Sequence, residues 1–109
     1  EWTYQKWNSG IAECFIEDHD CGLLKMGWKL PDGSNRSPDI QFPAYPFAFK
    51  VHPYVGFTFN GDNVLAYRGS YISTVTTAST SLPPRCFVVD WNTSDMHPWI
   101  GCFVKGRWK

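Results

Sequence analysis

The densest group of chemically capable side chains lies between residues 90 and 99, in the sequence DWNTSDMHPW. Aromatic rings stack on the C–H faces of sugars, and aspartate, asparagine and histidine exchange hydrogen bonds with sugar hydroxyls. Loops on a rigid scaffold often carry function. The candidate ligand-binding residues are therefore Asp90, Trp91, Asn92, Asp95, His97 and Trp99. The alternative is that the two tryptophans end and begin core strands while the polar residues shape a turn.

The sequence gives little support for catalysis or metal binding. It contains no G-x-S-x-G, C-x-x-C or glycine-rich phosphate loop. His97 lies near Asp95, but no nucleophile is tied to that pair. In the acidic run Glu17–Cys21, His19 and Cys21 lack structural-zinc spacing, and no calcium-loop pattern is present. We expect no catalytic residue, metal or cofactor, and we interpret the acidic run as a solvated loop.

The composition describes one small domain, 1–109, without a strong electrostatic preference. The chain has 109 residues, with ten basic and ten acidic side chains, so nothing in its charge predicts nucleic acid or an anionic membrane as a partner. No apolar run reaches membrane-spanning length. Four cysteines allow three disulfide pairings in an oxidising compartment, or buried free thiols in a reducing one.

Short strands fit the hydrophobic pattern better than helices. Trp7 and Ile11 flank Asn-Ser-Gly, which predicts a hairpin turn with Gly10 in the left-handed conformation. Alternation places Ala12, Cys14 and Ile16 on one face of the next strand. In the last run, alternation turns Cys102, Val104 and Trp108 inward and Lys105, Arg107 and Lys109 outward.

Other strands are expected at 23–29, 47–51, 55–59, 64–72 and 85–91, with a fraying strand at 73–81 and a loop at 34–39. Seven or eight short strands with regular turns describe an antiparallel sandwich or barrel. We predict an all-β fold, an antiparallel β-sandwich.

Three stretches carry a resemblance to a known family. The chain opens with WTYQKWNSGIAEC at 2–14, ends with VKGRWK at 104–109, and has YPFAF at 45–49. Together they resemble the C-terminal domain of tail-fibre and minor structural proteins in phages and prophages of Gram-positive bacteria. Gln5 replaces the usual basic residue, Phe15 stands where Trp is common, and 86–99 matches nothing expected of the family.

The resemblance implies a homotrimeric tip domain that binds host cell-wall or surface polysaccharide and follows an upstream tail-fibre shaft. Its location would be the virion tail, assembled in the bacterial cytoplasm. The abrupt aromatic start at Glu1 then suggests that a longer chain precedes the domain. Folding in a reducing cytosol implies free cysteines, with Cys14 and Cys102 as core thiols.

Two other functions remain open on the sequence. One is a structural trimerisation cap that closes the fibre without receptor contact. The other is a small secreted, disulfide-bonded enzyme or toxin of ribonuclease type, in which His52 would work with Arg68 or Arg85. Glu13 is a charge between apolar neighbours. We expect it to lie on a solvated face, to pair with Lys6 across the hairpin, or to join an ion pair at a trimer interface.

Overall fold

The chain begins with the predicted β-hairpin. β1 (Thr3–Lys6) pairs antiparallel with β2 (Ile11–Asp20). The Trp7 N–H donates to the Ile11 carbonyl at 2.8 Å, and the Gly10 N–H donates to the Trp7 carbonyl at 3.0 Å. Gly10 has a φ of 99°. This left-handed conformation is unfavourable for residues that have a Cβ atom, and glycine has none. The predicted turn and its glycine are confirmed.

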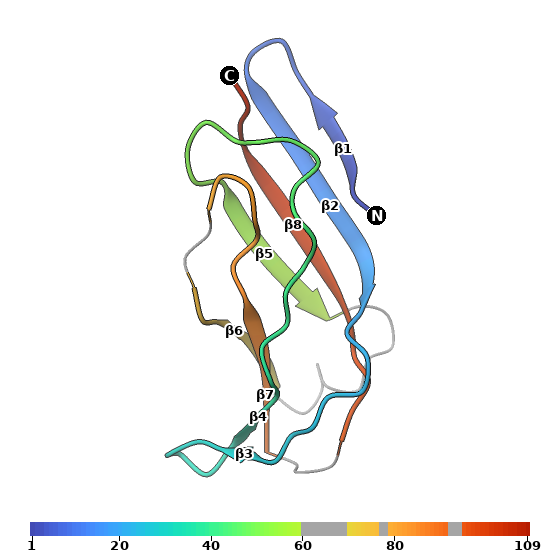
Figure 1. Ribbon diagram of the computed structural model, residues 1–109, viewed down its shortest axis with the longest axis vertical. Coiled ribbons are helices and arrows are strands. Elements are labelled where there is room, and N and C mark those ends of the chain that lie inside the picture. The colour runs from blue at the N-terminus through green and yellow to red at the C-terminus, as the bar shows by residue number, and fades with distance from the viewer. Residues whose placement is uncertain (60–69, 77–78, 92–94) are drawn as a thin grey trace.

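The computed structural model describes residues 1–59, 70–76, 79–91 and 95–109, and within these residues the fold is all-β (Figure 1). Six strands follow the hairpin: β3 (Trp28–Lys29), β4 (Asn35–Arg36), β5 (Tyr54–Phe59), β6 (Tyr71–Thr74), β7 (Cys86–Asp90) and β8 (Trp99–Arg107). The strand order is β1-β2-β8-β5 in the first sheet and β3-β4-β7-β6 in the second, with antiparallel pairing throughout. Among the described residues, no helix is long and apolar enough to cross a membrane.

One apolar core joins the two sheets. The first sheet contributes the inward side chains of β2 and β8, and the second contributes those of β7; these are Ala12, Cys14, Ile16, Ile100, Cys102, Val104, Cys86 and Val88. Each fully buried aliphatic side chain such as Ile100 contributes about 1.5–3 kcal/mol to folding. The alternation predicted for β2 and β8 is confirmed, and the shared core gives the sandwich-like layering of two sheets.

The two ends of the chain meet at the hairpin. The Trp108 N–H donates to the Gly10 carbonyl at 2.9 Å, and the Trp108 indole Nε1–H donates to the Trp7 carbonyl, also at 2.9 Å. The Lys6 ammonium lies 4.7 Å from the centre of the Phe47 ring and 4.9 Å from that of Trp108. Residues from 2–14, 45–49 and 104–109 therefore form one packed unit.

Segment 47–51 is not a strand, contrary to the prediction. The Phe49 N–H donates to the Thr80 carbonyl at 2.9 Å, while the Lys50 N–H donates to the Arg107 carbonyl at 2.8 Å. These neighbouring residues bond to different parts of the chain, so no ladder forms. The alternating apolar pattern that suggested a strand has another cause: Phe47 and Phe49 both pack against the core from an irregular segment.

Other boundaries also differ from the sequence prediction. β4 lies inside the expected loop at 34–39, and β2 continues through the acidic run to Asp20, with a register irregularity between Ile16 and His19. Of the expected strand at 23–29, the structure has β3 and an isolated bridge at Leu24. The sequence predicted strand from 64 to 81, of which the structure describes 70–76 and 79–81; within these residues only 71–74 is a strand. Residues 64–69 and 77–78 lie outside the described residues.

The partner of Glu13 is Lys105 rather than Lys6. The two residues stand opposite each other on β2 and β8, with Glu13 Oε1 and Lys105 Nζ 3.5 Å apart. Lys6 stands opposite Ala12, a core residue, and so belongs to the inner face. The predicted Glu13–Lys6 pair across the hairpin does not form, because Gln5, not Lys6, stands opposite Glu13. Adjacent residues on a strand point to opposite faces.

Candidate functional site

His97 and Trp99 form a pair of stacked rings where β8 begins. Their ring centres are 5.8 Å apart and their planes differ by 9°. Trp99 is 46% exposed and stands opposite Asp20, the last residue of β2. The pair therefore offers flat aromatic surface to solvent from the end of the first sheet, on a strand fixed by pairing on both sides.

Asp20 places a carboxylate beside this ring pair. The His97 Nε2–H donates to Asp20 Oδ1, and the Gly22 N–H donates to the same oxygen at 2.9 Å. The Gly22 hydrogen bond, followed by that of His97, holds the pKa of Asp20 below its ordinary value of 3.8. The carboxylate is therefore charged near neutral pH. Both of these donors bind Oδ1 of the carboxylate.

A second charged pair links the segment after β2 to the segment before β8. Lys25 Nζ lies 2.9 Å from Asp95 Oδ2, and both side chains are exposed. Leu24 and Met96 exchange backbone hydrogen bonds of 2.6 and 3.0 Å, so the segment after β2 is tied to the segment before β8. An exposed ion pair adds less than about 1 kcal/mol to stability. Here it joins the segment after β2 to Asp95, which precedes His97 by two residues in the chain.

The structure divides the predicted site residues between the two sheets. Asp95, His97 and Trp99 gather at the start of β8, as described. Asp90, at the end of β7, is buried and accepts a 2.8 Å hydrogen bond from the Ser70 hydroxyl. Trp91 is exposed and follows β7 in the second sheet, and Asn92 lies outside the described residues. Asp90 is thus an interior residue, and its burial keeps it from the ring pair's exposed surface.

Sequence reasoning missed Asp20 and Lys25. Both fall in or beside the acidic run that was interpreted as a solvated loop, 70 or more residues before their partners. The run is solvated, since Glu17, Asp18 and Asp20 are exposed, but it is part of a strand. The pairing of β2 with β8 brings Asp20 opposite Trp99, and the Leu24–Met96 bridge brings Lys25 to Asp95. A single sequence contains no signal for either register.

Residues considered for metal binding or ribonuclease chemistry do not converge in the described part of the chain. Within it, no group of three or more His, Cys, Asp or Glu side chains is arranged to hold a metal ion. His52 is exposed in the segment before β5, whereas Arg85 contacts Asp39 beside β7. Arg68 lies outside the described residues. The described cysteines are free thiols.

Comparisons with known proteins leave the chain without a match. A scan against protein-family models, a search of curated proteins and a search of solved structures each return nothing similar.

Proposed function

We propose that this chain is the receptor-binding tip domain of a phage tail protein and that it recognises a host cell-surface saccharide. The observation that carries the proposal is the exposed His97–Trp99 ring stack, with the Asp20 carboxylate hydrogen-bonded to His97. Asp95 precedes His97 by two residues in the chain and pairs with Lys25. Tryptophan faces stack on sugar C–H surfaces, and carboxylate oxygens accept hydrogen bonds from sugar hydroxyls. This arrangement supports the proposal of a shallow sugar-binding surface.

The phage-tail part of the proposal comes from the terminal motifs, and the packing of those motifs supports it. The opening, middle and closing stretches meet around Lys6, Phe47 and Trp108, although they are far apart in sequence. Residues that build one structural unit are expected to be retained together. The three stretches that carry the resemblance build one such unit, and this is the support that their packing gives to the proposal.

In the proposed assembly the domain is a homotrimer at the end of a fibre shaft, in the virion. A single shallow site binds weakly, and three linked copies raise the apparent affinity through effective concentration. A structural cap without receptor contact is the second candidate, and it predicts trimers that bind no glycan. The disulfide-bonded secreted enzyme has less support, because Cys14, Cys86 and Cys102 are buried free thiols.

The test has two measurements. Light scattering coupled to size exclusion gives the native mass, and the proposal expects three chains, formed by the domain itself or once a shaft is attached. Binding is measured with purified cell-wall polysaccharides of Gram-positive bacteria. Trp99→Ala should weaken binding about tenfold, the order of one aromatic contact. Tyr54→Ala removes another exposed ring, 85% exposed on β5, and serves as the matched control.

Two results would contradict the saccharide assignment. One is equal binding by the Trp99→Ala, Tyr54→Ala and unmodified proteins, and the other is a folded trimer that binds none of the wall polysaccharides. The second result would support the structural cap instead. Thermal unfolding of each variant shows whether a loss of binding is a loss of fold.

A further inference from the structure

The outer face of the second sheet carries a row of large side chains. Trp28 stands opposite Arg36, Arg36 opposite Val89, and Val89 opposite Tyr71, so one line crosses β3, β4, β7 and β6. Directly opposed residues share a face of the sheet. Trp28 is 57% exposed and Tyr71 is 50% exposed, whereas Val89 between them is buried.

β7 shows that this row faces away from the core. Cys86 and Val88 belong to the core cluster, so the alternate residues Arg85, Phe87 and Val89 point outward. Trp91 continues the alternation just beyond the strand and is 62% exposed. We call Trp28, Tyr71, Phe87 and Trp91 together the aromatic face.

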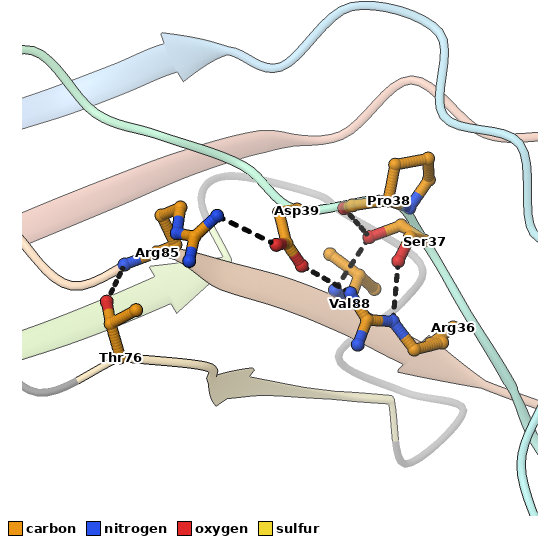
Figure 2. Close-up of polar contacts among 7 residues, drawn as sticks. All are labelled: Arg36, Ser37, Pro38, Asp39, Thr76, Arg85 and Val88. Atoms are coloured by element: carbon orange, nitrogen blue, oxygen red, sulfur yellow. Dashed lines mark hydrogen bonds and ion pairs between the residues drawn. The ribbon is translucent and has the colours of Figure 1, made fainter.

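Arg36 is held rigidly within the aromatic face. The central carbon of its guanidinium lies 4.0 Å from the centre of the Trp28 ring and 3.8 Å from that of Phe87. The Arg36 Nε–H donates to the Ser37 carbonyl at 2.9 Å, and Nη2 donates to Asp39 Oδ1 (Figure 2). Cation–π contacts with two rings and a charge-assisted hydrogen bond fix the group in place.

Among the described residues, the cluster of charged groups around Asp39 has two positive groups and one negative group. Figure 2 shows Asp39 between Arg36 and Arg85, and Arg85 Nη1 lies 3.5 Å from the other oxygen of Asp39. Two guanidinium groups therefore share one carboxylate, and Arg85 keeps about half of its side chain exposed. An anionic ligand would complement this arrangement.

We propose that the aromatic face binds a linear polysaccharide that carries carboxylate groups. Trp28 and Tyr71 are three strand spacings apart, about 14 Å, so one extended sugar chain can stack on both rings. Arg85 lies along the same face and offers planar donors that suit a carboxylate. The exposed rings stand apart, separated by Arg36 and the buried Val89, whereas a protein partner needs a contiguous apolar centre.

This surface is separate from the His97–Trp99 pair, and the proposal does not depend on the phage-tail assignment. His97 and Trp99 belong to the end of the first sheet, whereas the aromatic face covers the second. The two proposals can therefore fail independently. A variant at one surface should leave binding at the other unchanged.

Affinity electrophoresis of the whole chain in native gels tests the proposal. The probes are polygalacturonate, alginate and hyaluronan, with methyl-esterified polygalacturonate as the uncharged counterpart. We expect retardation by at least one carboxylated probe and about tenfold weaker binding after Trp28→Ala or Tyr71→Ala. Arg85→Gln should weaken binding to the charged probe and abolish the difference from its methyl ester. Tyr54→Ala, a ring lost from the first sheet, should bind normally.

The Trp28 ring stacks on Arg36, so Trp28→Ala can disturb β3 and β4. For that reason the second variant is Tyr71→Ala, which changes β6 at the other edge of the sheet. Absence of retardation by all three carboxylated probes overturns the proposal, as does equal weakening by Tyr54→Ala. A change of native mass in Tyr71→Ala would make the face a contact between copies of the chain and would also overturn it. If Trp99→Ala alone abolishes polysaccharide binding, this proposal fails while the proposed function stands.

Discussion

Replacing Gly106 with alanine should destabilise the fold, because the inner side of β8 has no room for a methyl group at that position. A Cβ there would lie 2.9 Å from Pro53 Cβ, 3.0 Å from Phe49 Cδ1 and 3.1 Å from Pro53 Cα. Pro53 Cα is backbone and Phe49 is buried, so neither can move without disturbing its neighbours. Overpacking of this kind costs about 1–3 kcal/mol.

The loss of chain flexibility in the unfolded state offsets part of that cost, by about 0.4–1 kcal/mol for Gly→Ala. The net expectation is a free energy of unfolding lower by about 1–2 kcal/mol. For a domain of this size, such a loss lowers the midpoint of thermal unfolding by roughly 4–9 °C. Calorimetry and urea denaturation followed by tryptophan fluorescence measure the change independently.

Gly56 is the matched control, on β5, which pairs with β8. A Cβ at Gly56 would have nothing within 4 Å, and the backbone there is not left-handed. Gly56→Ala should therefore be neutral or stabilising by up to about 1 kcal/mol. If Gly106→Ala and Gly56→Ala unfold at the same temperature, crowding by Pro53 and Phe49 does not explain why residue 106 is glycine.

Three further predictions concern titration and the terminal unit. Burial raises the pKa of all four thiols from 9.0 to about 12; they are Cys14, Cys21, Cys86 and Cys102. The folded protein should therefore react slowly with Ellman's reagent at pH 8, and its stability should fall as the pH rises from about 9 to 12. The sign follows because the folded state holds those protons to higher pH than the unfolded state. In carboxyl NMR titration, Asp20 should have a pKa below 3.8 that His97→Ala raises only in part, since the Gly22 N–H is the larger cause. Trp108→Phe deletes the hydrogen bond to the Trp7 carbonyl and should cost about 1 kcal/mol in urea denaturation.

The sequence predicts the local features of this fold well. Gly10 in a three-residue turn requires only local chemistry, and the structure has it at a φ of 99°. Cys14, Cys102 and Val104 lie in long strands where alternation has room to repeat, and all three are in the core. Long alternating runs and glycine turns are signals that neighbouring residues alone determine.

Short or irregular elements escape the same reasoning. β4 is only Asn35–Arg36, two polar residues that would be assigned to a loop by composition. They are buried because the Arg36 guanidinium lies between the rings of Trp28 and Phe87, and because β4 pairs with β7 more than 50 positions away. A guanidinium stacked between aromatic rings can be buried, because the rings interact favourably with its charge. The identity of the residue as arginine predicts exposure instead.

The candidate site shows the same limit from the functional side. DWNTSDMHPW is rich in sugar-binding residue types, yet alternation along β7 buries Asp90 and turns Trp91 to the outer face of the second sheet, with Trp28 and Tyr71. The start of β8 then places Trp99 in the first sheet, opposite Asp20. A stretch that connects two sheets divides its side chains between two surfaces. The composition of the stretch identified these residues as binding candidates. Strand register decides which of them share a surface, and it gives the residues near β7 and those near β8 different neighbours.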